Sequence, residues 1–190
     1  MTSADTYQGA DDALLTRVRS ADARVRRAAF EELVAAYHGR VYRLCHGVTN
    51  NQADAEEACQ DVFVAVYRGL DGFRGQARLA TWIYRITLRT AARVRARSRH
   101  RQEVPESAST NTSNSQAGDR GRAMARIIDR DRLRIAMGRL GLEHRTVLLL
   151  VLVEGLRHTE VAQILGIPVG TVWSRLHYAR KLLRRELENL

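Results

Sequence analysis

The chain has few of the residues that interrupt helices or build disulfide frameworks: its 190 residues include two prolines and two cysteines. Two cysteines are too few for the framework of a small secreted domain, and they lack the paired spacing of a structural zinc site. No alternating run of apolar residues is long enough to predict a sheet. No signal peptide opens the chain, and the longest apolar run, residues 147–153, is too short to span a bilayer. The sequence therefore predicts an all-α protein of the cytoplasm, without membrane insertion.

Catalytic and metal-binding patterns are also missing. His38, Cys45 and His46 come nearest to a metal cluster, but a fourth ligand is absent. Cys45 and Cys59 are expected to be small buried apolar residues instead. There is no Gly-rich phosphate loop, nucleophile motif or metal quartet, so an enzyme is the weakest functional hypothesis and no cofactor is predicted.

Positive charge, in contrast, is abundant and unevenly placed. The net charge is +10, and Lys181 is the one lysine among 31 basic residues. Residues 1–71 carry a net charge of −3, residues 72–101 carry +9, and residues 102–190 carry +4. Guanidinium groups pair with phosphates through two parallel bonds, so the excess favours a polyanionic partner. Genome composition can also favour arginine over lysine. The net charge is therefore stronger evidence for a polyanionic partner than the choice of arginine is.

The stretch that organises the chain lies near its C-terminus, at residues 156–187. A short apolar-periodic segment, residues 160–165, stops at Gly166, which can adopt the left-handed conformation of a helix end. Pro168 suits the start of a second helix, along which apolar side chains recur at steps of three or four. The pattern predicts a helix-turn-helix, the unit that lays its second helix in the major groove of DNA. A solvated basic helix in an ordinary bundle is the alternative.

Two features mark the N-terminal half. A helix is predicted to begin near Asp22 and to break near Gly39. A further helix, residues 51–68, has a strongly acidic first half. Acids there suit the positive end of the helix dipole, and the functional alternative is an acidic docking face for a basic partner.

The helix predicted from about Leu79 to His100 combines aromatic side chains with arginines that cannot all face one side. Its arginine-dense end must project into solvent or towards phosphate. Single-stranded nucleic acid needs such a surface, because bases stack on rings, at roughly 1–3 kcal/mol each, while guanidinium holds the backbone. Core packing of Trp82 is the alternative.

These stretches together resemble the sigma-70 family of sigma factors, in its small extracytoplasmic-function (ECF) class. The resemblance lies in Asp54-Ala-Glu-Glu-Ala-Cys-Gln-Asp-Val-Phe, in Thr81-Trp-Ile-Tyr-Arg-Ile, in the spacer that follows, and in residues 160–180. It implies a transcription initiation factor with two helical domains, sigma region 2 and sigma region 4.

The predicted domain bounds follow from the composition and the resemblance together. An N-terminal extension occupies residues 1–21 and region 2 occupies residues 22–101. Residues 102–121 have almost nothing to bury and predict a flexible linker, and region 4 occupies residues 122–190.

The resemblance implies three sets of binding residues. In this family the acidic helix docks on the clamp helices of the largest RNA polymerase subunit, and region 4 meets the polymerase flap. The core-binding residues are then Asp54, Glu56, Glu57, Gln60, Asp61 and Phe63. Region 2 recognises and melts the −10 promoter element, which implies contacts from Phe73, Arg74, Arg78, Trp82, Tyr84, Arg85 and Arg89. Region 4 reads the −35 element, which implies contacts from Thr171, Trp173, Ser174, Arg175, His177, Tyr178 and Arg180.

Several residues depart from the family pattern. Arg157 stands where a capping Ser or Thr is common, so the first helix of the motif loses about 0.5–2 kcal/mol unless another group compensates. Arg89 and Arg93 stand where Asn and Asp are frequent, so the resemblance does not predict the exact −10 base preference. Trp173 and Tyr178 stand at positions often held by basic residues, so apolar and stacking contacts are expected in reading the −35 element.

Distance constrains the two-domain interpretation. Promoter elements about 16–17 base pairs apart are separated by about 55 Å, at roughly 3.4 Å per pair. A relaxed coil of about 20 residues spans about 25 Å, and full extension reaches roughly 66 Å. The linker must therefore be held extended during promoter binding, as on the surface of a polymerase.

Two other expectations stay open. A two-domain DNA-binding regulator that recruits no polymerase would share the helix-turn-helix and the linker, but it has no need of the acidic helix. Members of the ECF class are often held inactive by an anti-sigma factor, so such a factor is an expected partner beside RNA polymerase core and promoter DNA.

Overall fold

The computed structural model describes residues 13–103 and 131–189, which form helices and connecting turns with no strand among them. The elements described from end to end are α2 (Ala23–Thr49), α3 (Gln52–Gly69), the 3-10 turn η1 (Leu70–Gly72), α4 (Leu79–Glu103), α6 (Leu142–Leu148), the π-helical turn η2 (Leu149–Val153), α7 (His158–Leu165) and α8 (Val169–Glu188). Residues 13–18 and 131–139 are helical as well. The predicted all-α class, with two helical regions, is confirmed. Most of the predicted linker lies outside the described residues.

The helices α2, α3 and α4 pack against one another as one unit. The carboxylate of Asp22 accepts a hydrogen bond from the Arg24 N–H at 2.8 Å, so α2 begins at the predicted cap. The predicted break near Gly39 is wrong, because α2 runs continuously to Thr49. Its buried stripe, which includes Leu33, continues in phase past Gly39, and packing outweighs the cost of about 1 kcal/mol that glycine brings.

Helix α2 ends at Asn50 in the left-handed conformation, with φ 59°. Asparagine adopts this conformation more readily than most residues. The next residue, Asn51, caps α3 by accepting a hydrogen bond from the Asp54 N–H at 3.0 Å. Two consecutive asparagines therefore join the helices in a tight corner.

The helices α6, α7 and α8 form the second unit, with Val147, Leu150, Val161, Val172 and Leu176 in its core. Gly166 has φ 66°, and the Ile167 N–H donates to the Ala162 carbonyl at 3.1 Å, as at a glycine-terminated helix end. Pro168 then precedes α8. The predicted helix-turn-helix is confirmed in its turn and in both helices.

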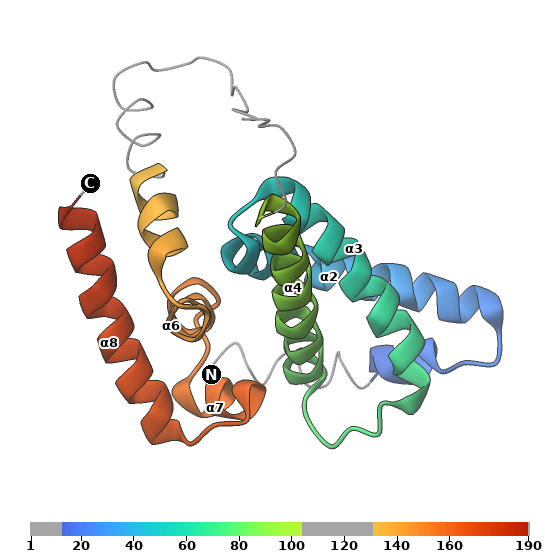
Figure 1. Cartoon of the computed structure of the whole chain (residues 1–190). Helices are drawn as coiled ribbons and strands as arrows, with labels where there is room; N and C mark the ends of the chain where they lie inside the picture. The colour runs from blue at the N-terminus through green and yellow to red at the C-terminus, as the bar shows by residue number, and fades with distance from the viewer. Residues whose placement is uncertain (1–12, 104–130, 190) are drawn as a thin grey trace, which may run out of the picture.

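The two units lie directly against each other. Helix α7 contacts α4, while α6 and η2 contact α2. In Figure 1 the second unit, in orange and red, stands beside α4 rather than apart from it. Sequence periodicity gave no indication of this contact.

Candidate nucleic-acid and polymerase interfaces

The outer face of α8 is largely open. Trp173 is 58% exposed and Tyr178 is 53% exposed, both on the second helix of the helix-turn-helix. Of the other residues predicted to contact the −35 element, Ser174, His177 and Arg180 are exposed, and Thr171 and Arg175 are half-buried. All seven belong to one helix, with apolar residues such as Leu176 on its inner side.

His158, the first residue of α7, holds the indole of Trp173. The two rings are stacked with centroids 3.9 Å apart and planes inclined by 6°. The Nε2 atom of His158 is buried and has no hydrogen-bond partner. The imidazole thus acts mainly as a flat surface that fixes the ring of Trp173. Sequence reasoning missed His158, although an aromatic ring at the start of the first motif helix was a signal.

Helix α6 supports two further residues of α8. Glu143 forms an ion pair with Arg175 at 2.8 Å, and the ring of His144 lies 5.4 Å from the ring of Tyr178. Arg175 is therefore already paired within the unit, whereas Tyr178 remains open to solvent. Sequence reasoning missed Glu143 and His144, because their contacts depend on how α6 crosses α8.

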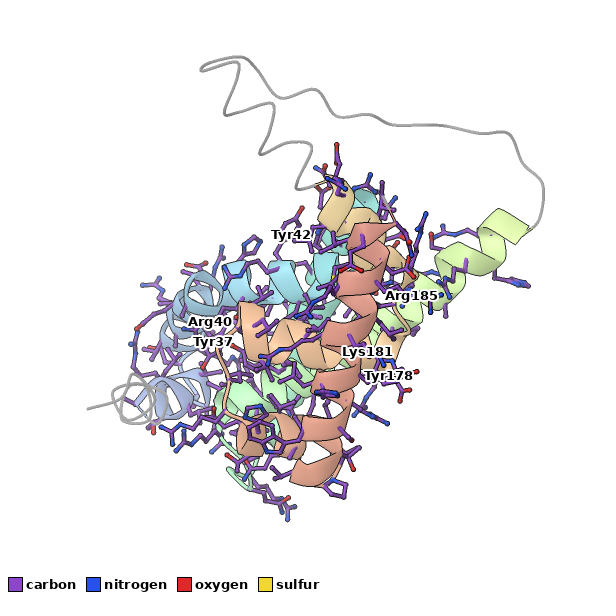
Figure 2. The ribbon with its side chains drawn as sticks, turned by 90° about the vertical axis from the view of Figure 1, so that its left-hand side faces the viewer. Tyr37, Arg40, Tyr42, Tyr178, Lys181 and Arg185 are labelled. Carbon is purple, nitrogen blue, oxygen red and sulfur yellow. The ribbon has the colours of Figure 1, made fainter. Side chains whose placement is uncertain are left out.

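Basic residues continue along α8 beyond Tyr178. Figure 2 shows Tyr178, Lys181 and Arg185 succeeding one another along this helix. Lys181 and Arg185 are exposed. Steps of three and four residues separate Tyr178, Lys181 and Arg185, which places these side chains on one side of the helix. There the positive charge can meet a phosphate backbone.

The predicted −10 residues divide into a packed group and an exposed group. Phe73 and Tyr84 are buried, and burial raises the pKa of Tyr84. Trp82 is half-buried, with its ring 5.0 Å from that of Phe73. A Cβ at Gly69 would come within 2.9 Å of the Trp82 ring, so glycine is needed there. Trp82 therefore packs against the core and at the same time remains partly exposed to solvent.

The exposed group consists of Arg74, Arg78, Arg85 and Arg89. Two of these arginines are bound by α7. The Arg85 guanidinium donates to the Gln163 carbonyl at 2.6 Å and 3.2 Å, and Arg78 lies 3.6 Å from the Glu160 carboxylate. Glu160 also accepts a hydrogen bond from the Arg157 N–H at 2.8 Å, the contact that the residue at this position makes in a capping box.

The acidic side of α3 is paired with α4. Asp61 binds Arg93 at 3.3 Å, and Glu57 binds Arg97 and lies 4.0 Å from Arg101. Of the remaining predicted core-binding residues, Glu56 and Gln60 are exposed, Asp54 is half-buried and Phe63 is buried. Asp54 stands in the first turn of α3, where its charge suits the helix dipole. Sequence analysis did not predict these cross-helix pairs.

Both cysteines of the N-terminal unit, and its His38, are packing residues. Cys45 and Cys59 are buried free thiols, and burial raises the pKa of Cys45 to about 12 and also raises that of Cys59. His38 stacks on Phe63 at 6.1 Å. In the part of the chain that the structure describes, no three metal-ligating side chains gather, and no helix there could cross a membrane.

A helix-turn-helix with an open aromatic and basic face, joined to an arginine-rich helical unit, defines a DNA-binding protein. Residues 33–102 match the family model of Sigma-70 region 2, and residues 130–183 match that of Sigma-70, region 4. The chain belongs to the sigma-70 family, in its ECF class, whose members act in transcription initiation and direct RNA polymerase to promoters.

Similar proteins agree with this assignment. The chain is 32% identical over 169 residues to the ECF RNA polymerase sigma factor SigW of Bacillus subtilis, covering 85% of this chain and 90% of that protein. It is 28% identical to the ECF RNA polymerase sigma-E factor of Escherichia coli K12 over 95% of both chains.

Two solved structures share the fold. One is CnrH in complex with the cytosolic domain of CnrY, with a TM-score of 0.70, 23% identity and coverage of 95% of this chain and 98% of that one. The other is the sigma factor RpoE in complex with the anti-sigma factor NepR from Bartonella quintana, with a TM-score of 0.65, 21% identity and coverage of 84% and 96%.

Proposed function

We propose that α8 reads the −35 element in the major groove while α4 and the segment before it recognise and melt the −10 element. The open face of α8 is the observation that carries this proposal. Trp173 and Tyr178 offer apolar surface to base edges, including the thymine methyl, and Arg180, Lys181 and Arg185 supply charge for phosphates.

On α4, the exposed guanidinium groups of Arg78, Arg85 and Arg89 are suited to the backbone of a single strand. The partly open ring of Trp82 is suited to stacking with an unpaired base. Phe73 and Tyr84 support this surface from below, since both are buried. Arg74 extends the surface at the turn that precedes α4.

Melting DNA costs about 1.4 kcal/mol for each base-pair step, which a unit of this size cannot offset alone. RNA polymerase core must therefore contribute. The α3 face of Asp54, Glu56, Glu57, Gln60 and Asp61 is the proposed docking site for the clamp helices of the largest subunit, with Phe63 packed beneath it, and region 4 is proposed to meet the flap. We expect the isolated chain to bind promoter DNA poorly.

An anti-sigma factor is a further proposed partner. It is supported by the two related folds, both solved with another protein bound, which for RpoE is an anti-sigma factor. Such a factor would act by covering the α3, α4 or α8 surface.

Transcription in vitro tests the proposal. Core polymerase with genomic DNA fragments of the source organism is expected to give defined transcripts only when this chain is added. Reversing the charges at Asp54, Glu57 and Asp61 is expected to abolish them. The control is reversal of Glu31 and Glu32, which are exposed acids of α2 that pair with Arg27 and Arg17. A triple variant that transcribes normally would refute the docking role, and binding to promoters without any stimulation of transcription would indicate a regulator that recruits no polymerase.

A further inference from the structure

We propose that Arg19 is a positioning residue for the −10 surface. It fixes the turn at residues 70–78, which joins α3 to α4, in the shape that promoter melting needs, and it acts through Phe73 rather than by touching DNA. This inference rests on the proposed −10 role of α4 and of the turn before it. It gives a function to residues 13–20, which sequence analysis assigns to the N-terminal extension.

Residues 13–18 form a short helix that packs into the N-terminal unit. Leu14 is 7% exposed and Val18 is 2% exposed, and both belong to the hydrophobic core. Arg17 also forms an ion pair with Glu32 of α2, at 2.7 Å. The short helix is therefore anchored to the body of the unit, so a side chain that extends from its end has a fixed base.

Arg19 extends from the end of this short helix to the turn before α4, beside which the helix lies in Figure 1. Its backbone N–H donates to the Leu15 carbonyl at 3.2 Å, so Arg19 still follows the helical path. Its guanidinium donates through Nη2 to the backbone carbonyl of Phe73, 54 residues later. The Phe73 N–H donates in turn to the Leu70 carbonyl at 3.2 Å. Both polar backbone atoms of the buried Phe73 thus have partners, and Arg19 supplies the one that comes from a distant segment.

The rest of the turn is held much less firmly. Among the residues that the structure describes, residues 74–77 form no hydrogen bond with another element. Arg74, Gly75 and Gln76 are exposed, and Gly75 has φ 71°, a conformation that favours glycine. Fixing such a backbone costs conformational entropy, so an unanchored turn would sample many shapes. The hydrogen bond to Phe73 limits these shapes before DNA arrives.

Phe73 connects this anchor to the residues that are proposed to meet DNA. Its ring lies 5.0 Å from the ring of Trp82, with the two planes inclined by 38°. Arg74 follows Phe73 directly, and Arg78 ends the turn. Release of the Phe73 carbonyl would let the Phe73 ring move, and with it the Trp82 ring that is proposed to stack on an unpaired base. A surface that is already in place loses less entropy on binding, so the Arg19 contact favours the melted promoter.

Salt dependence separates a positioning role of Arg19 from a direct contact with phosphate. An arginine that binds a phosphate displaces a counterion, so its loss reduces the slope of log affinity against log salt concentration by about one. An arginine that donates to a carbonyl of its own chain displaces none. The wild-type and Arg19→Gln holoenzymes are therefore expected to show the same slope on promoter DNA.

Trp82 itself can report the state of the turn. The chain has two tryptophans, so Trp173→Phe leaves Trp82 as the single indole fluorophore. In this background, Arg19→Gln is expected to raise the acrylamide quenching constant of the isolated full chain by about twofold, because the Phe73 ring no longer shields the indole. Arg24→Gln is the matched control, since it removes the same charge from an exposed side chain of α2 that has no partner among the described residues.

Transcription complexes test the consequence for the promoter. The DNA is a genomic fragment that the wild-type chain transcribes with core polymerase, carrying 2-aminopurine in its −10 element. Arg19→Gln holoenzyme is expected to bind this fragment within about twofold of wild type, since the −35 surface is intact, and to melt it about tenfold more slowly. Arg19→Lys keeps a donor for the Phe73 carbonyl and should recover most of the melting rate. Arg24→Gln should match the wild type in both measurements.

The outcomes separate this inference from the proposed function. Increased quenching of Trp82 in Arg19→Gln, together with slow melting and retained binding, would support the positioning role. Unchanged quenching, a wild-type melting rate, a reduced salt slope or no recovery by Arg19→Lys would each overturn it. Failure of the wild-type chain to direct transcription would refute the proposed function, whereas quenching in the isolated chain would still report whether Arg19 fixes the turn.

Discussion

On α8 the rings of Trp173 and Tyr178 stand more than half exposed, whereas on α4 Arg78 and Arg85 are already bound to α7. This difference between α8 and α4 follows from the stiffness of aromatic side chains and the flexibility of arginine. A stacked indole or phenol ring is stiff and loses little entropy when it is held ready at the surface. A flexible arginine gains from any carbonyl or carboxylate within reach, so an arginine surface tends to find an internal partner. The proposed −35 surface is thus already open, whereas two arginines of the proposed −10 surface have partners within the chain.

The strongest way to break this comparison is to remove the support of α8. Leu176 is buried between α8 and the rest of its unit. Leu176→Ala is expected to lower the free energy of unfolding by about 2–5 kcal/mol, because a cavity remains. Urea unfolding followed by circular dichroism would measure this loss. Leu133→Ala, at an exposed leucine, should change the value by less than about 0.5 kcal/mol.

A substitution on the outer side of α8 should instead weaken DNA binding and leave stability almost unchanged. Trp173→Ala is expected to weaken promoter binding by the holoenzyme by ~1–3 kcal/mol, since apolar contact with base edges is lost. Stability should hardly change, because the ring is mostly exposed. Repeating the measurement with deoxyuridine in place of thymine in the −35 element should mimic the variant. Equal binding by Trp173→Ala and wild type would remove Trp173 from the proposed surface.

A smaller effect should come from His158. His158→Ala leaves Trp173 without its stacked ring and is expected to weaken −35 binding by about 0.5–1.5 kcal/mol. His158→Phe keeps a flat ring and should restore most of the affinity. Fluorescence anisotropy with promoter DNA and holoenzyme would compare the three proteins. Weakening by both variants alike would show that the stack does not matter.

The smallest expected effect is a loss of stability at acidic pH. Burial, and secondly the charge of Arg134, lower the pKa of His46 below its usual 6.5. The folded state therefore favours neutral imidazole, so stability is fully present above the unfolded pKa and falls as the pH drops below it. We expect a small decrease in melting temperature between about pH 7 and pH 5. His46→Gln should reduce the decrease, and an identical pH profile for both proteins would contradict this cause.

Local signals predicted much of this molecule. Gly166 and Pro168 gave the turn of the helix-turn-helix, and Asp22 gave the start of α2. Each is a backbone preference that acts within a few residues. The same kind of signal failed at Gly39, because burial along α2 outweighs the preference of one glycine.

The contacts that define the surfaces could not be predicted in this way. Arg85 binds a carbonyl 78 residues away, and Arg145 binds one 97 residues away. Neither contact leaves a periodic trace in the sequence, since each depends on how two helical units meet. The burial of Tyr84, proposed from sequence as a contact residue, likewise depends on which side of α4 faces the core.

The π-helical turn η2 has a consequence for how the chain tolerates a change of length between α6 and α7. Its wide turn is visible in the hydrogen bond from the Glu154 N–H to the Leu149 carbonyl, five residues earlier. Compared with an α-helix, such a turn contains one extra residue. Because the turn absorbs that residue, deleting one residue from η2 would restore ordinary winding and leave the chain beyond it facing nearly the same way. The ion pair of Glu154 with Arg43 is therefore expected to survive the loss of one codon in this turn.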